Sequence, residues 1–169
     1  MPPEPASEFS RPLPLGLVGP EGRREILEAD EGERIALARR FGIPSVESLR
    51  AELRLWLEAD GAVRAEGNLR ASVVQACVIT LEPVSQEVEE PVALRLLPPE
   101  REPRDEPDEE ADEIATGNGV ADLGEAVAEQ LALALDPYPR APDAVLPAEA
   151  SEAGEHPMAA LAKLRAAKH

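Results

Sequence analysis

The stretch 51-AELRLWLEADGAVRAEGNLRASVVQACVITLEP-83 decides the fold class. Over residues 51–59, apolar and polar residues alternate, which is the period of a strand with one buried face and one wet face. Asp60-Gly61 follows as a hairpin signal, and the odd positions from 63 to 81 then form a second apolar row. We therefore predict two long strands that pair in an antiparallel hairpin.

The second apolar row is too long for one straight strand. We expect a bend or bulge in it, near Gly67 or at residues 73–75, where two apolar neighbours and a glutamine upset the alternation. Pro83 is expected to end the row, and Cys77 is placed on its inward side as a small buried side chain. A further alternating run over residues 88–96 predicts a strand that pairs back on this one.

Two helices are expected on either side of these strands. Asp30 followed three residues later by Glu33 predicts a capping box, and residues 31–41 carry an apolar face at helical spacing. Asp122 is the expected cap of a second helix, whose apolar residues repeat over 123–135 before a proline ends it. The predicted fold is α+β, with an antiparallel sheet of about four to five strands packed by two main helices.

The pattern predicts a single domain over residues 9–142. Residues 1–8 are expected to be a flexible N-terminus, and residues 143–169 a flexible tail with a short basic-ended helix. Within the domain, residues 99–113 hold nine acidic and two basic side chains, a net charge of −7, with three prolines among them. Because such a segment buries too little apolar surface to offset its ordering entropy, we expect an acidic disordered loop over 99–120.

Composition narrows the classes of partner. The chain of 169 residues carries 17 Lys and Arg against 34 Asp and Glu, a formal net charge of −17. Broad electrostatic capture of DNA, RNA or an anionic membrane needs clustered cations, so the charge favours a cationic partner. No run of about 18 apolar residues and no signal peptide is visible, and we expect a cytoplasmic protein.

No residue pattern predicts catalysis, a cofactor or a metal. Both histidines, His156 and His169, fall in the predicted flexible tail, whereas a catalytic imidazole needs a rigid site. Cys77 is the only cysteine, and with the histidines it lacks zinc-site spacing. The acidic run lacks the alternate ligands and turn glycine of a calcium loop, and Thr116 to Gly119 lack the lysine of a phosphate loop. We therefore expect no enzyme.

Two features remain as candidates for an interaction. Trp56 lies on the polar face of its strand, where it either packs under a helix or marks a contact surface. The acidic loop is the other candidate, and its central carboxylates would meet a cation. The residues we single out in it are Asp105, Glu106, Asp108, Glu109 and Glu110.

The run from Gly67 to Pro83 resembles the signature of the YceD family, the large ribosomal RNA subunit accumulation proteins, in its alphaproteobacterial-type branch. Further similar stretches, in the same order, extend the resemblance over about residues 8–142, outside the acidic loop. The positions that carry the signature are Gly67, Ala71, Cys77, Leu81 and Pro83.

The resemblance implies a non-catalytic role in biogenesis of the large ribosomal subunit, in accumulation of its RNA. Many members have a second cysteine at the position of Thr80, and many have a cysteine-rich segment where residues 136–144 have none. A metal role is therefore not carried over to this chain. Because a net charge of −17 repels RNA, we expect contact with RNA to be indirect, through a basic large-subunit ribosomal protein that the acidic loop and sheet surface would shield.

The alternative to an assembly factor is an acidic protein that imitates nucleic acid, or another protein–protein adaptor. Mimicry of phosphates needs carboxylates on a rigid face, so backbone order parameters across 99–120 would separate the two readings.

Overall fold

The computed structural model describes residues 7–103 and 110–145, and in them it has a layer of helices on one side of a sheet. The five-stranded sheet has the order β2-β3-β4-β5-β6, and a separate two-stranded sheet pairs β1 with β7. Neighbours β2 to β5 are antiparallel, whereas β6 runs parallel to β5. The predicted α+β class with two helices is confirmed; the sheet is mixed, because of β6. The elements in chain order are β1 (Pro12–Pro14), the 3₁₀ turn η1 (Leu15–Leu17), β2 (Arg23–Glu28), α1 (Glu31–Phe41), β3 (Ser45–Leu57), β4 (Val63–Ala76), β5 (Pro83–Leu96), β6 (Asp112–Ile114), β7 (Val120–Asp122) and α2 (Leu123–Ala134).

Both predicted helix caps are present. The Asp30 carboxylate accepts a hydrogen bond from the Glu33 amide, and the Glu33 carboxylate accepts one from the Asp30 amide, each at 2.9 Å, which completes the capping box of α1. At α2, the Asp122 carboxylate accepts from the amides of Gly124 and Glu125. These bonds satisfy amide groups that lack partners inside the helix, so both helices begin where the sequence predicts.

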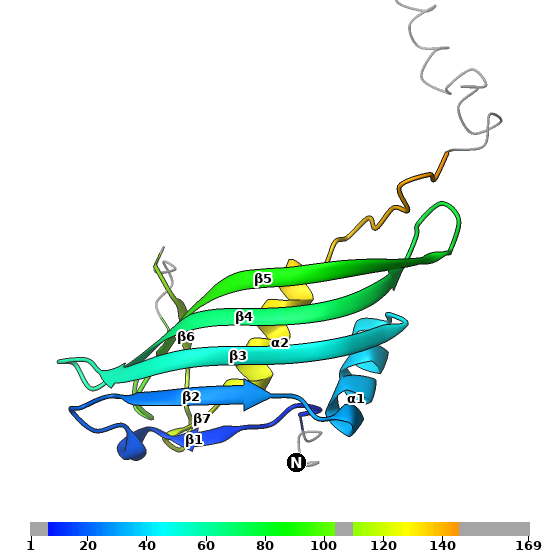
Figure 1. Cartoon of the computed structure of the whole chain (residues 1–169). Coiled ribbons are helices and arrows are strands. Elements are labelled where there is room, and N and C mark those ends of the chain that lie inside the picture. The colour runs from blue at the N-terminus through cyan, green and yellow to red at the C-terminus, as the bar shows by residue number, and fades with distance from the viewer. Residues whose placement is uncertain (1–6, 104–109, 146–169) are drawn as a thin grey trace, which may run out of the picture.

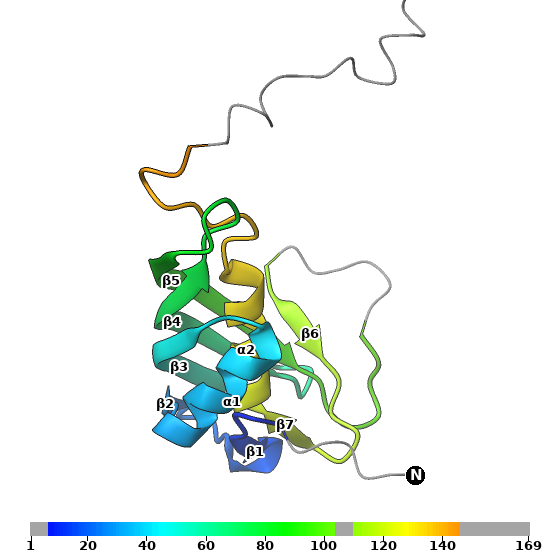
Figure 2. The same ribbon diagram turned by 90° about the vertical axis from the view of Figure 1, so that its right-hand side faces the viewer.

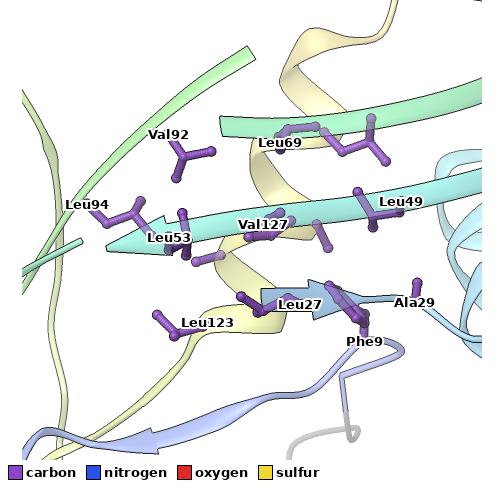
Figure 3. Packing of buried hydrophobic residues seen from close by; sticks show 14 of the residues in the cluster. Phe9, Leu27, Ala29, Leu49, Leu53, Leu69, Val92, Leu94, Leu123 and Val127 are labelled. Carbon is purple, nitrogen blue, oxygen red and sulfur yellow. The ribbon is translucent and has the colours of Figure 1, made fainter. Parts of the chain in front are cut away.

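The alternation in β3 and β4 separates the two faces of the sheet as predicted. Residues at odd positions, such as Leu53 and Leu69, are buried, and they point toward α2 together with Leu27, Val92 and Leu94 (Figure 3). Figure 2 shows that both helices lie on this one side, so no helix formed by residues 7–103 or 110–145 covers the other face of the sheet. The core therefore lies between the sheet and α2, and the opposite face is open.

The bend or bulge that was predicted for β4 lies in its partner strand, β3. The register shifts in β3 between Val46 and Ser48, opposite Ser72 and Val73 of β4, while β4 pairs without a break. The shift moves the buried row of β3 from an even position, Val46, to odd positions, and so keeps it on the core side. Of the two predicted positions, residues 73–75 lie next to the bulge but in the partner strand, and the pairing at Gly67 is regular.

The prediction that the second apolar row continues as a strand to residue 81 is wrong. β4 ends at Ala76 and Pro83 begins β5, so Cys77 lies in a turn between the strands. The turn is closed by hydrogen bonds from the Cys77 amide to the Glu82 carbonyl and from the Leu81 amide to the Cys77 carbonyl. Cys77 is buried as expected, but Leu81 is 78% exposed and has a positive φ of 61°.

The acidic stretch is ordered in part, contrary to the expected loop over 99–120. Residues 104–109 lie outside the described part of the chain, but Asp112–Ile114 form β6 beside Leu94–Leu96 of β5. The Leu97 amide donates to the Ile114 carbonyl, and the Thr116 hydroxyl donates to the Leu97 carbonyl at 2.6 Å. The segment is therefore fastened to the sheet at its C-terminal end.

The last two residues of the predicted flexible N-terminus, Ser7 and Glu8, make contacts with the domain. The Ser7 hydroxyl donates to the Phe9 carbonyl, and Glu8 pairs with Arg40 at 3.1 Å, so these two residues of the expected flexible N-terminus are held. Residues 1–6 lie outside the described part. Residues 146–169 also lie outside the described part of the chain. They include most of the predicted flexible tail, the positions of its expected helix and both histidines.

Candidate functional site

The open face of the sheet is covered by charged side chains in a fixed register. Cross-strand pairs on this face include Arg54 with Arg24 and Glu66, and Trp56 with Arg64. The register places equal numbers of arginines and glutamates there: Arg24, Arg50, Arg54, Arg64, Arg70 and Arg95 against Glu28, Glu52, Glu66, Glu87, Glu89 and Glu113. Within the strands, positive and negative side chains therefore balance on this face, and Glu58, Asp60 and Glu110 add carboxylates at its edge, beside Arg64 and Arg95.

Most of these arginines are already in ion pairs. Arg50 contacts Glu52 at 3.0 Å, Arg64 contacts Glu66 at 2.9 Å and Arg70 contacts Glu89 at 2.8 Å. The pairs of Arg50 and Arg70 are exposed and add little stability, whereas the Arg64 side chain is only 11% exposed; in all three pairs the two charges neutralise each other. Arg54 is the exception on the described open face, since it is exposed and its side chain makes no hydrogen bond or ion pair with the described residues.

A groove of ≈ 740 Å³ is hollowed into the open face around Arg54 and Trp56. One wall comes from the turn that precedes β2, and the other from the middle of β5, on either side of β3 and β4 (Figure 1). Trp56 is half-buried in this groove, on the face away from the helices, so it does not pack under a helix. The lining residues are Pro20, Glu21, Gly22, Arg54, Trp56, Glu66, Gly67, Pro91, Val92 and Ala93.

Two glycines permit the close approach of strands beneath the groove. A Cβ on Gly67 would overlap the carbonyl oxygen of Glu52 in β3. Gly22 has a positive φ of 75°, and a Cβ there would lie 2.8 Å from the Leu55 carbonyl oxygen. Both positions therefore require glycine for steric reasons, which gives the signature residue Gly67 a structural role.

At one end of the sheet, the nearly buried Arg95 of β5 links the β3–β4 connection to β6. The Arg95 side chain is 8% exposed and contacts Glu58 at 2.7 Å, Glu113 of β6 at 2.7 Å, and Asp60 in the β3–β4 turn. These carboxylates, Glu58 first, raise the pKa of Arg95, so it is charged at all ordinary pH values. The amide of Ala62, followed by nearby guanidinium groups, lowers the pKa of Asp60 to about 2.

The acidic residues singled out from the sequence are not brought together by the described structure. Asp105, Glu106, Asp108 and Glu109 lie outside the described residues. Glu110 is exposed; its carbonyl accepts from Arg64 at 3.4 Å, and its carboxylate lies 3.8 Å from the same guanidinium. This end of the acidic segment therefore lies beside β4.

Of the remaining signature positions, Ala71 and Cys77 are buried, whereas Leu81 and Pro83 are exposed in the turn and at the start of β5. Ala71 is buried in β4 on the core side, and Pro83 is the first residue of β5. The Cys77 sulfur accepts hydrogen bonds from the amides of Ile79 and Thr80 at 3.5 Å and of Ala141 at 3.3 Å. Hydrogen bonding by Thr80, followed by that of Ala141, lowers the pKa of the thiol to about 7.

This thiol predicts a pH-dependent stability. Because folding lowers its pKa from the ordinary 9.0, the thiol stabilises the fold fully above pH 9.0, and this contribution is lost as the pH falls through about 7. The advantage of the native chain over Cys77→Ser in urea denaturation should therefore grow between pH 7 and pH 9. An advantage that stays constant over this range would contradict the shifted pKa.

In residues 7–103 and 110–145 no three His, Cys, Asp or Glu side chains are arranged to hold a metal ion. Among the same residues, no helix has the length and apolarity needed to cross a membrane.

Gln75, the glutamine within the apolar row, is buried and donates to the Asp136 carbonyl at 2.8 Å, so it fastens the chain after α2 to β4.

The fold and these surfaces define a two-layer α+β protein with one open, charge-balanced sheet face. A family model, that of the large ribosomal RNA subunit accumulation protein YceD, matches residues 65–165. This is more than half of the chain, and the chain belongs to the YceD family. Membership suggests a role in accumulation of the large-subunit ribosomal RNA, and the family is not known as catalytic. No curated protein and no solved structure matches the chain.

Proposed function

We propose that the protein is a non-catalytic factor in biogenesis of the large ribosomal subunit and that it supports accumulation of the ribosomal RNA by binding a basic ribosomal protein of that subunit. The family match supports the ribosomal role. The observation that carries the choice of partner is the net charge of −7 over residues 99–113, in a chain whose total is −17. Complementary charge speeds encounter with a cationic protein and repels naked RNA.

The structure supports presentation of the acidic segment from a fixed base. β5 and β6 flank the segment and pair with each other, and Arg95 contacts Glu113 beside them. The open face, where glutamates and arginines balance, is a poor source of this attraction. We therefore assign the long-range electrostatic attraction of the basic partner to the acidic segment. We place the role in the cytoplasm, and we assign the chain to the alphaproteobacterial-type branch on the resemblance of the run from Gly67 to Pro83.

The test is capture of basic proteins from a purified mixture of large-subunit ribosomal proteins on the immobilised full chain. A segment variant carries Asp105→Asn, Glu106→Gln, Asp108→Asn and Glu109→Gln; Glu110 is kept because it contacts Arg64. A control variant removes four exposed charges elsewhere, with Glu31→Gln, Glu90→Gln, Glu129→Gln and Asp143→Asn. We expect the segment variant to lose most of the capture at low salt and the control to retain it.

Two results would overturn the proposal. One is equal capture by the native chain and the segment variant. The other is tight binding of the purified native chain to naked large-subunit RNA, abolished by RNase, with no basic polypeptide present.

A further inference from the structure

The groove on the open face contains an aromatic ring that no described cation covers. Trp56 lines it together with the apolar side chains of Pro20, Pro91 and Ala93. In the described part of the chain, the cation–aromatic contact is that of Arg11 over Phe9, at 4.6 Å, and it lies away from the groove. An indole face attracts an ammonium or guanidinium group, and apolar walls suit the methylene stem of a lysine or arginine.

Two charged side chains in the same lining have no partner among the described residues. Glu21 is exposed and makes no ion pair or hydrogen bond there, and the same holds for Arg54. Glu66, the third charged residue of the lining, is paired with Arg64. The groove thus offers one free carboxylate beside the indole, and one free guanidinium.

The charges favour a cationic occupant. The one free carboxylate, Glu21, can pair with a cation beside the indole, and the −17 charge of the chain attracts cations at long range. An acidic peptide could form an ion pair with Arg54. It would be repelled, however, by Glu21, by Glu66 and by the net negative charge of the chain. A neutral carbonyl oxygen of a bound peptide backbone can accept from Arg54 without that repulsion.

We propose that this groove binds an extended basic segment of a polypeptide. One lysine or arginine side chain lies against Trp56 with its charge toward Glu21, and Arg54 donates to a main-chain carbonyl of the same segment. A second groove of ≈ 530 Å³, which shares Gly22, Arg54 and Gly67 with the first, lets the bound segment continue across β3 and β4. The inference rests on the proposed function, since the segment would belong to the basic partner.

Trp56 is the only tryptophan of the chain, so its fluorescence reports directly on this groove. The full chain is titrated with a lysine–alanine peptide, with the same peptide carrying glutamate for lysine, and with a uridine oligonucleotide. We expect a saturable change in emission with the lysine peptide only. Glu21→Gln should weaken that binding about five- to tenfold. Glu90→Gln removes one charge on the other sheet face, opposite Leu69, and should leave the affinity unchanged.

The proposal is overturned if the lysine peptide binds by calorimetry without changing Trp56 emission, if Glu21→Gln and Glu90→Gln behave alike, or if the acidic peptide or the oligonucleotide produces the saturable change. Failure here is distinguishable from failure of the proposed function. If the groove does not bind the lysine peptide but capture of basic ribosomal proteins still depends on the acidic segment, only the groove proposal fails. If the groove binds the lysine peptide but the chain captures no basic ribosomal protein, only the proposed function fails.

Discussion

Gly67→Ala is expected to destabilise the protein by about 3 kcal/mol or more, enough to leave little folded protein if the native chain has ordinary stability. The added Cβ would overlap the carbonyl oxygen of Glu52 and lie 2.8 Å from its carbonyl carbon and 3.0 Å from the Cα of Leu53. These are backbone atoms of the neighbouring strand, so no side-chain rotation relieves the overlap. Urea denaturation followed by far-UV circular dichroism measures the loss.

A matched control is Gly19→Ala. No atom lies within 4 Å of a Cβ built at Gly19, and its φ is not in the positive range. We expect its free energy of unfolding to stay within about 0.5 kcal/mol of the native value. Equal stability of the two variants would show that β3 leaves room for a Cβ at Gly67, contrary to the predicted overlap with the Glu52 carbonyl oxygen.

Arg95→Met is expected to cost about 3 kcal/mol of the free energy of unfolding. The substitution keeps much of the side-chain volume but removes the guanidinium that Glu58, Asp60 and Glu113 share, in a position that is 8% exposed. The three carboxylates would then repel one another in a partly dehydrated site. Because Glu113 belongs to β6, amide hydrogen exchange should show early loss of protection around residues 112–114.

The control for this change is Arg70→Met on the same face of the sheet. Arg70 is exposed and pairs with the exposed Glu89, so its loss should have little effect on stability. If Arg95→Met and Arg70→Met were equally stable, the ion cluster would have no role in holding β6.

The parts of the fold that local chemistry determines were predictable. Helix α1 follows from the capping box of Asp30 and Glu33, which needs only residues three apart. The β3–β4 hairpin follows from the alternation of its strands and from Gly61, whose φ of 87° explains the Asp-Gly signal. In each case the signal and the structure that it specifies lie within a few residues of each other.

The missed elements depend on partners far away in the sequence. β2, Arg-Arg-Glu-Ile-Leu-Glu, is mostly charged, and it forms an edge strand because β3 offers it a ladder. β6 lies in a stretch whose composition indicates disorder, and it is ordered by parallel pairing with β5 and by Arg95. Neither partner is visible in the local pattern.

The candidate site was predicted in outline only. Trp56 was singled out as an outward aromatic residue, and it does line a groove. The walls, however, come from residues 20–22 and 91–93, which only the sheet register brings beside it. The bulge shows the same limit: the spacing of Val46 and Leu49 marks a change of parity in β3, but only the pairing with β4 shows which strand holds the extra residue.

The parallel pairing of β6 sets a minimum length for the acidic connection. A chain that returns to run beside a strand in the same direction must cross over the sheet, which takes about a dozen residues. Residues 97–111 provide fifteen, little more than this minimum. The number of residues is therefore constrained by geometry, whereas their charge is not. An evolutionary or engineered deletion there would detach β6, but a replacement by uncharged residues of equal length would not.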